Sequence, residues 1–262
     1  MHEKGIKMYK MKDKTESFHK DKGLMFNLPM RIACVGRSML SGKTSRIISI
    51  LYQSDPRLYK HEYKPENIFI FSPSAHTDFK LKTYIEEKGI PEENIFLDFD
   101  EEQIDDLYEI LKEQYNEDIE EGKKPEHKLF WFDDMSYSGK LGKKKHGIIS
   151  KLMCNSRHIL LSLIITSQKY LGDLPTIVRE NLTGCMLFSC TDKQLDGISN
   201  DHNIFDNKKT FKSMFRKVTS EPHTTLTINY SNPEKYRYLN NDFLPIGPCG
   251  SVLKEFNGDC KC

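Results

Sequence analysis

The sequence has no long hydrophobic run. No stretch of its 262 residues approaches the roughly 18 apolar residues that a membrane-spanning helix requires. The first 25 residues are polar and rich in lysine, and they lack the apolar core of a secretory signal. We therefore expect a protein without a membrane span that stays inside the cell.

Neither sign of charge is in excess. The chain has 39 Lys and Arg against 38 Asp and Glu, which leaves a net charge of +1. This balance gives no general attraction to nucleic acid, so any DNA-binding surface must be local. The candidates are the lysine-rich segments 4–22 and 140–145, the second containing Lys140, Lys143, Lys144 and Lys145. A solvated charged surface is the alternative interpretation of both segments.

The seven cysteines form no Cys-x-x-Cys pair, and no histidine stands at a zinc-ligand spacing from them. We therefore do not expect a zinc site. Three of the cysteines lie in apolar, strand-like runs and are predicted to be buried thiols: Cys34, Cys185 and Cys190.

After residue 25, short apolar runs alternate with helix-like stretches. The runs span residues 30–35, 67–72, 94–98, 128–132, 161–166 and 184–190. Runs that are apolar on both faces and separated by helices are typical of a mostly parallel sheet covered on both sides. Residues 101–117 carry the apolar side chains of Ile104, Leu107, Ile110 and Leu111 at helical spacing on an acidic background, which predicts a surface crossover helix.

These patterns predict an α/β fold in one main domain. We expect a flexible basic arm over residues 1–25, the α/β domain over 26–240 and a tail over 241–262, which is rich in Gly and Pro toward its end.

Residues 31–45 follow the order of a phosphate-binding strand, loop and helix. An apolar run ends at Gly36, a polar loop reaches Ser41, and Gly42-Lys43-Thr44-Ser45 precede a helix-like stretch. Backbone N–H groups at such a helix start favour an anion. Lys43 would add a cation for the outer phosphates of ATP, and the Thr44 hydroxyl would be a ligand of Mg²⁺.

The loop departs from the usual pattern Gly-x-x-x-x-Gly-Lys-Thr, because Arg37 stands where the first glycine is expected. Gly36 lies one residue earlier, as if Met39-Leu40 replaced a single residue. Either the loop is one residue longer than usual, or Arg37 takes the place of the first glycine. A helix start without a ligand is the alternative for Gly-Lys-Thr alone.

Two further strand ends carry groups suited to nucleotide hydrolysis. The run 128–132 ends in Asp133 and Asp134, at the position where an ATPase needs one carboxylate for Mg²⁺ and one to polarise the attacking water. The run 161–166 leads to Gln168, whose amide would sense the outer phosphate and the water. Taken alone, Asp133-Asp134 would also be typical of a solvated turn. Gln168 alone would be more typical of a residue that caps a strand-to-helix loop.

The stretch 155–181, which follows Asp133-Asp134-Met135, resembles the signature of viral genome-packaging ATPases. Its parts are Arg157-His158, the strand to Gln168, and Leu-Pro-Thr-Ile-Val-Arg179-Glu-Asn. The resemblance extends over about residues 30 to 240. It is to the poxvirus type found in large DNA viruses and virophages, within the FtsK/HerA superfamily.

This resemblance implies a RecA-like P-loop NTPase fold of the additional-strand type. It implies a homo-oligomeric ring, pentameric or hexameric, that moves double-stranded DNA into a capsid without reading its sequence. It also implies capsid proteins as partners, and a location in the host cytoplasm or in the virion. Carried over by position, Lys43 and Thr44 are the phosphate and Mg²⁺ residues, Asp133 and Asp134 the strand-end acids, and Gln168 the sensor.

Arg157 and Arg179 are the arginines of this signature, and one of them is expected to act on the nucleotide of a neighbouring subunit. A helix cap for Arg157 and an ion pair for Arg179 are the structural alternatives. Two other functions stay open at the level of the sequence. One is a P-loop helicase or partition ATPase, and the other is a scaffold subunit with a degenerate phosphate loop.

Overall fold

The structure is a computed structural model, and it describes residues 15–38, 41–53, 58–134 and 147–256. Its helices are α1 (Lys43–Tyr52), α2 (Phe79–Lys88), α3 (Glu101–Glu120), α4 (Ile148–Asn155), α5 (Thr176–Glu180), α6 (Asp192–His202) and α7 (Lys208–Val218). Its strands are β1 (Arg31–Val35), β2 (Ile68–Phe71), β3 (Ile95–Phe96), β4 (Lys128–Phe132), β5 (Leu161–Ser167), β6 (Gly184–Leu187), β7 (Leu226–Asn229) and β8 (Tyr238–Leu239). Among these helices, none combines the length and the apolar character of a membrane-crossing segment.

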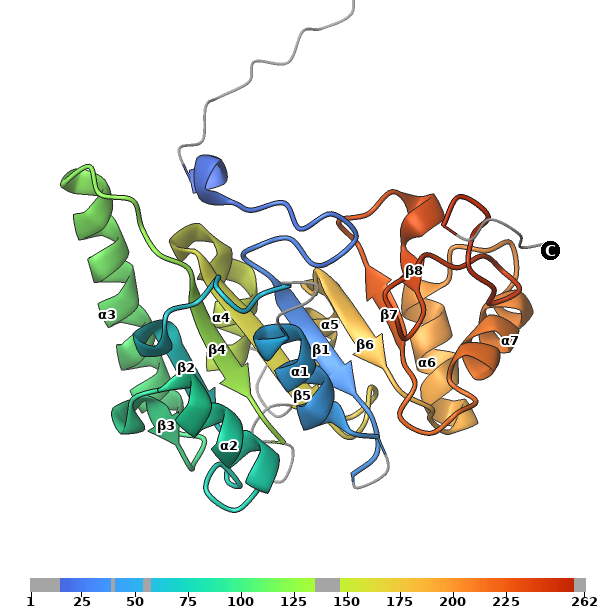
Figure 1. Cartoon of the computed structure of the whole chain (residues 1–262), viewed down its shortest axis with the longest axis horizontal. Coiled ribbons are helices and arrows are strands. Elements are labelled where there is room, and N and C mark those ends of the chain that lie inside the picture. The colour runs from blue at the N-terminus through green and yellow to red at the C-terminus, as the bar shows by residue number, and fades with distance from the viewer. Residues whose placement is uncertain (1–14, 39–40, 54–57, 135–146, 257–262) are drawn as a thin grey trace, which may run out of the picture.

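The strands form one sheet in the order β3-β2-β4-β5-β1-β6-β7-β8 (Figure 1). The first six strands in this order pair in parallel, whereas β7 is antiparallel to both of its neighbours, β6 and β8. The predicted parallel sheet is therefore confirmed. Strand β5 lies between β4 and β1, so it separates the strand of the two acids from the strand of the phosphate loop, as an additional-strand topology requires.

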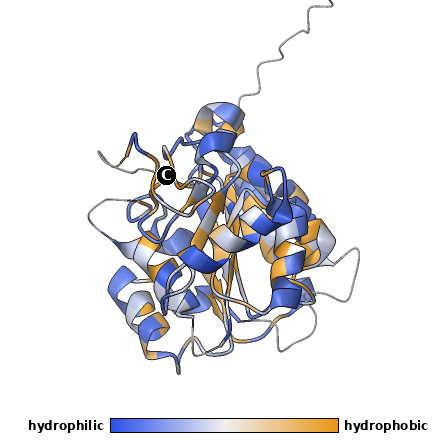
Figure 2. Cartoon of the chain, turned by 90° about the vertical axis from the view of Figure 1, so that its right-hand side faces the viewer, coloured by the Kyte–Doolittle hydropathy of each residue, from blue (hydrophilic) through white to orange (hydrophobic). Residues whose placement is uncertain are grey.

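Helices cover both faces of the sheet because the strands are apolar on both. In β4, Leu129 and Trp131 pack toward the cluster that contains α1 and α2. Phe130 and Phe132 alternate with them and pack toward the cluster of α3 to α7. Figure 2 shows apolar residues gathered on the strands in the middle of the molecule. Cys34 and Cys185 are buried in these clusters as predicted, and Cys190 is half-buried.

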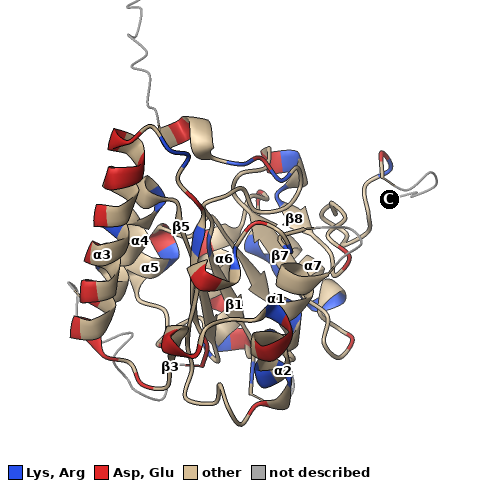
Figure 3. Ribbon diagram, turned by 60° about the vertical axis from the view of Figure 1, so that its left-hand side comes forward, with Lys and Arg blue, Asp and Glu red and all other residues tan. Residues whose placement is uncertain are grey.

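Helix α3 carries acidic residues along its length, as Figure 3 shows. The predicted crossover helix is present, and Ile104 and Leu111 of its predicted stripe are buried. Ile110 is 60% exposed, and the buried stripe is completed by Tyr108 and Tyr115. The helix begins at Asp100, whose carboxylate accepts hydrogen bonds from the backbone N–H groups of the first turn.

The segment predicted as a tail contacts the domain over part of its length. Pro245 and Val252 form bridges with Leu239 and Ile246, and Ile246 is only 2% exposed. The same segment contacts α1, because the Arg46 guanidinium donates to the Asn241 carbonyl at 2.6 Å. In the described part of the predicted arm, the Lys20 and Lys22 ammonium groups both pair with Glu62.

Candidate functional site

The phosphate loop connects β1 to α1 at the carboxyl edge of the sheet. Gly42 precedes the helix with a φ of 81°, a left-handed conformation that glycine adopts without strain. Among the described residues, no side-chain hydrogen bond caps α1 at Gly42. The first N–H groups of α1, which have no partner within the helix, are therefore available to an anion.

Gly36 occupies the most crowded position of the loop. A Cβ atom there would lie 2.5 Å from Ser41 Cβ and 2.8 Å from the Phe188 ring. The close approach lets the Ser41 hydroxyl donate to the Arg37 carbonyl at 2.7 Å. Arg37 itself is exposed. Gly36 therefore serves the close approach that a first loop glycine provides, which favours the longer loop over a substitution by Arg37. Met39 and Leu40 lie outside the described residues.

Gly36→Ala should weaken nucleotide binding about tenfold, because relieving its overlap with Ser41 and Phe188 means moving the loop, and such overpacking typically costs 1–3 kcal/mol. The measurement is the affinity for ATPγS by titration calorimetry. Gly247→Ala is the matched control, since its Cβ would meet only the Leu253 side chain, at 3.3 Å. Equal affinities of wild type and Gly36→Ala would contradict the expectation.

Lys43 is buried at the start of α1, with 8% of its surface exposed. Its ammonium donates to the Gly36 carbonyl at 2.9 Å, so the lysine lies folded against its own loop. Thr44 and Ser45 follow it in the first helical turn and line the same pocket. Lys43 is the first residue of α1, so its cation lies at the start of the helix.

Asp133 directly follows β4 and is 2% exposed. Its carboxylate accepts hydrogen bonds from the hydroxyls of Thr166, at 2.7 Å, and Ser72, at 3.4 Å. Burial raises the pKa of the Asp133 carboxyl, and the charges of Asp134 and Asp78 raise it further, against the Thr166 hydrogen bond and the charge of Lys43, which lower it. A cation beside this carboxylate would favour its charged form.

Asp134 and Gln168 meet across the ends of β4 and β5. The Gln168 amide donates to both carboxylate oxygens of Asp134, at 3.1 and 3.3 Å. Asp134 has a φ of 47°, and its backbone N–H donates to the Thr166 hydroxyl at 2.9 Å. The predicted acid and the predicted sensor are thus in direct contact.

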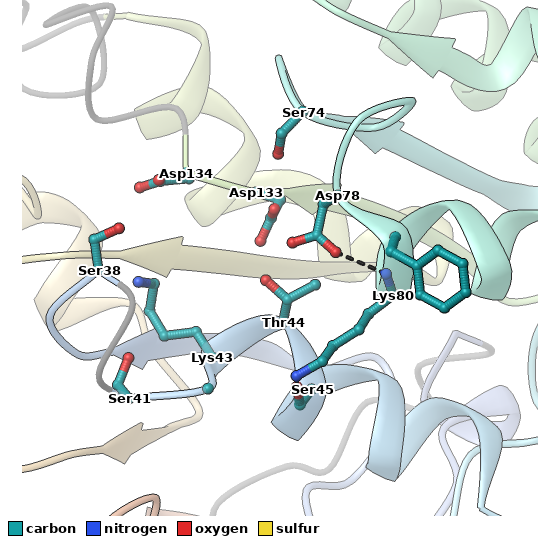
Figure 4. Close-up of a pocket in the computed structure, with 12 residues that line it drawn as sticks. Ser38, Ser41, Lys43, Thr44, Ser45, Ser74, Asp78, Lys80, Asp133 and Asp134 are labelled. Atoms are coloured by element: carbon teal, nitrogen blue, oxygen red, sulfur yellow. Dashed lines mark hydrogen bonds between the residues drawn. The ribbon is translucent and has the colours of Figure 1, made fainter.

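One pocket of about 470 Å³ joins these elements (Figure 4). Of the residues predicted from the sequence, seven line it: Ser41, Gly42, Lys43, Thr44, Ser45, Asp133 and Asp134. Gly36 lies behind the loop, and Gln168 reaches the site through Asp134. The lining residues that sequence reasoning missed are Ser38, Ser74, Asp78, Phe79 and Lys80. The sequence signal that could have identified them is the polar segment after β2, which leads to a helix N-cap at Asp78.

The pocket has the donor set that Mg²⁺ and a nucleotide phosphate require. Thr44 and Asp133 offer hydroxyl and carboxylate oxygens, which are the ligands Mg²⁺ prefers. In Figure 4 they lie on facing sides of the pocket, with Lys43 beside them. The cation-accepting carboxylate and the anion-accepting helix start therefore face one space.

The structure does not bring Arg157 or Arg179 to this pocket. Arg157 is exposed just before β5, at the sheet edge opposite Gln168. Arg179 lies on α5, pairs with Asp201 and stacks over the Tyr170 ring at 5.3 Å. The basic residues Lys140, Lys143, Lys144 and Lys145 lie outside the described residues.

The family model described as the poxvirus A32 protein matches residues 16–236, which is most of the chain. The chain belongs to the poxvirus A32 protein family. The comparison with curated proteins gives no match.

Solved structures with the same fold include a viral packaging protein. The genome packaging NTPase B204 from Sulfolobus turreted icosahedral virus 2, in complex with sulfate, has 16% identity to the A32-family chain and a TM-score of 0.50, over 77% of this chain and 92% of that chain. The same protein in complex with AMPPCP has 18% identity and a TM-score of 0.49, over 78% and 93% of the two chains. EssC from Geobacillus thermodenitrificans has 13% identity and a TM-score of 0.46, over 77% of this chain and 38% of that chain. The A32-family chain therefore has the P-loop fold of packaging ATPases.

Proposed function

We propose that this chain is an ATP hydrolase that drives double-stranded DNA into a viral capsid. The observation that supports this most directly is the meeting of Lys43, Thr44, Asp133 and Asp134 in one pocket at the carboxyl edge of the sheet. Membership of the A32 family and the fold shared with B204, a genome packaging NTPase, support the same function.

Each side chain has a chemical role in this proposal. The start of α1 and Lys43 bind the phosphates of ATP, and Lys43 leaves its Gly36 carbonyl partner to do so. Asp134 accepts the proton of the attacking water, and Gln168 orients Asp134 through its amide. Thr44 and Asp133 would hold Mg²⁺, which supplies positive charge to the phosphates when it is bound.

The proposal includes a homo-oligomeric ring around the DNA, located in the host cytoplasm or the virion, with capsid proteins as further partners. One signature arginine would act on the nucleotide of a neighbouring subunit, since neither reaches its own pocket. Arg157 is exposed, and no described residue forms an ion pair with it. Arg179 would first have to leave Asp201 and Tyr170.

ATP turnover should rise several-fold when duplex DNA is added, and DNA binding should fall steeply with salt and differ little between sequences. The measurements are steady-state hydrolysis with and without DNA, and fluorescence anisotropy with two unrelated duplexes. ATP turnover that does not change when DNA is added would contradict a DNA motor and favour a scaffold subunit. Separation of the strands of a forked duplex would instead indicate a helicase.

The segment 140–145 is the candidate DNA-binding segment. Replacing Lys140, Lys143, Lys144 and Lys145 by Gln should flatten the logarithmic salt slope by about one unit for each DNA phosphate that is no longer neutralised, and basal hydrolysis should persist. The control replaces four ion-paired surface lysines by Gln, namely Lys82, Lys112, Lys123 and Lys235. An unchanged slope would exclude the segment from DNA binding.

A further inference from the structure

Lys80 brings a second cation to the pocket from outside the phosphate loop. It is the second residue of α2, and its ammonium donates to the Ser45 hydroxyl at 2.7 Å. Ser45 lies directly after Thr44, in the first turn of α1. Figure 4 shows the Lys80 side chain extending from α2 to Ser45, with Thr44 between it and Lys43. The two lysines therefore approach the pocket from two different helices.

The charge of Lys80 is not neutralised within the described part of the chain. Its hydroxyl partner is neutral, and no described carboxylate forms an ion pair with it. The adjacent Asp78 uses one carboxylate oxygen to accept the backbone N–H groups of Lys80 and Leu81. By contrast, Lys82 in the same helix pairs with Glu86. Because an ammonium has three donors, two N–H groups of Lys80 remain for a ligand.

The position of Lys80 is unfavourable for the helix that carries it. The first turn of a helix is the positive end of its dipole, where acidic residues are stabilising and a cation is not. Asp78 at the N-cap follows this rule, and Lys80 opposes it. Helix stability therefore does not account for a lysine here, whereas an anion in the pocket does.

We propose that Lys80 binds the phosphate chain of the nucleotide, in the same subunit as Lys43 and from the opposite side of Thr44. This inference rests on the proposed function, because it assigns a residue to the ATP site of that function. A nucleoside triphosphate with one Mg²⁺ keeps a net negative charge, and Lys43 offsets only part of it. Lys80 supplies a further charge within the chain, and the Ser45 hydroxyl positions its ammonium at the pocket.

The test compares wild type, Lys80→Met, Lys80→Arg and Lys82→Met by displacement of a fluorescent ATP analogue. The competitors are ATPγS, inorganic tripolyphosphate and adenosine. Loss of a charge-assisted hydrogen bond should weaken ATPγS and tripolyphosphate roughly 10- to 100-fold in Lys80→Met. Adenosine should bind equally well to all variants, because it has no phosphate. Lys80→Arg should recover most of the affinity, and Lys82→Met should match wild type.

Three results would overturn the assignment of Lys80. One is an affinity of Lys80→Met for ATPγS within about twofold of wild type, which is well below the effect of a charge-assisted hydrogen bond. Another is an equal loss for adenosine, which would indicate a damaged pocket. The third is an affinity of Lys80→Arg for ATPγS as low as that of Lys80→Met, because arginine keeps the positive charge and the N–H donors.

The failure of this inference is distinguishable from the failure of the proposed function. If wild type binds ATPγS and DNA stimulates its hydrolysis, but Lys80→Met behaves like wild type, only the role of Lys80 is wrong. If Lys80→Met loses affinity for the phosphate ligands while DNA does not stimulate hydrolysis, the role of Lys80 is confirmed and the proposed DNA-translocating function is wrong. If wild type binds none of the phosphate ligands, both are wrong.

Discussion

Asp134→Asn should bind ATP with near wild-type affinity and hydrolyse it 10²- to 10⁴-fold more slowly, which is the range of general base contributions. An amide cannot accept the proton of the attacking water. Asparagine tolerates the left-handed backbone of this position, where φ is 47°, so the fold of the strand end should persist. The measurements are single-turnover hydrolysis and, separately, ATPγS affinity.

Asp192→Asn provides the control for this experiment, because Asp192 is exposed and pairs with Arg216 at the surface. Its hydrolysis rate should equal that of wild type. Loss of ATPγS binding in Asp134→Asn, with the fold intact, would assign Asp134 to the metal rather than to the water. Unchanged hydrolysis would remove Asp134 from the reaction altogether.

Lys43→Ala should lower kcat/KM for ATP by about 10²- to 10³-fold, the effect of removing one preorganised charge stabiliser. The lysine is buried at the helix start, and its ammonium has the Gly36 carbonyl as partner, 2.9 Å away. Alanine removes this cation without adding volume to the loop. Steady-state turnover of the purified variant measures the effect.

Lys112→Ala is the matched control for Lys43→Ala. Lys112 is half-exposed on α3, where it pairs with Glu109. Its turnover should be that of wild type. Retained turnover in Lys43→Ala would show that the Gly-Lys-Thr sequence begins a helix without binding a phosphate.

The strands and the first set of site residues could be predicted because local signals specify them. The apolar runs that predicted strands contain β1 to β4 and β6, and all of β5 except Ser167, since a strand buried on both faces is mostly apolar. Parallel strands end at one edge of the sheet, so Lys43, Asp133 and Gln168 had to lie near one another once each was assigned to a strand end. The contact between Gln168 and Asp134 is the consequence.

Some strand and helix ends differ from their predicted positions, because tertiary contacts decide where an element ends. The apolar run 184–190 predicted a longer strand than β6, which ends at Leu187. Phe188 still donates its N–H to the Val35 carbonyl, at 2.9 Å, but the chain then turns into α6 at Asp192. Helix α3 likewise continues to Glu120, three residues beyond its predicted end, and Ile119 in its last turn packs against the core.

The outer part of the site could not be predicted, because it depends on how two helices pack. Asp78 and Lys80 lie in α2, which has no phosphate motif of its own. Only the packing of α2 beside α1 brings Lys80 to Ser45. The role of Gly36 could not be predicted either. It follows from the close approach of Gly36 to Ser41, which the spacing of the motif does not indicate.

The acidic helix α3 restricts how subunits can stand around a duplex. Its sequence holds many carboxylates and only one lysine, and part of that charge is already paired with Lys151 of α4. The phosphate backbone of DNA would be repelled by what remains, most strongly at low salt. In a ring that encloses DNA, α3 should therefore point to the outside or toward a basic partner. Orientation within the assembly would then be set in part by repulsion.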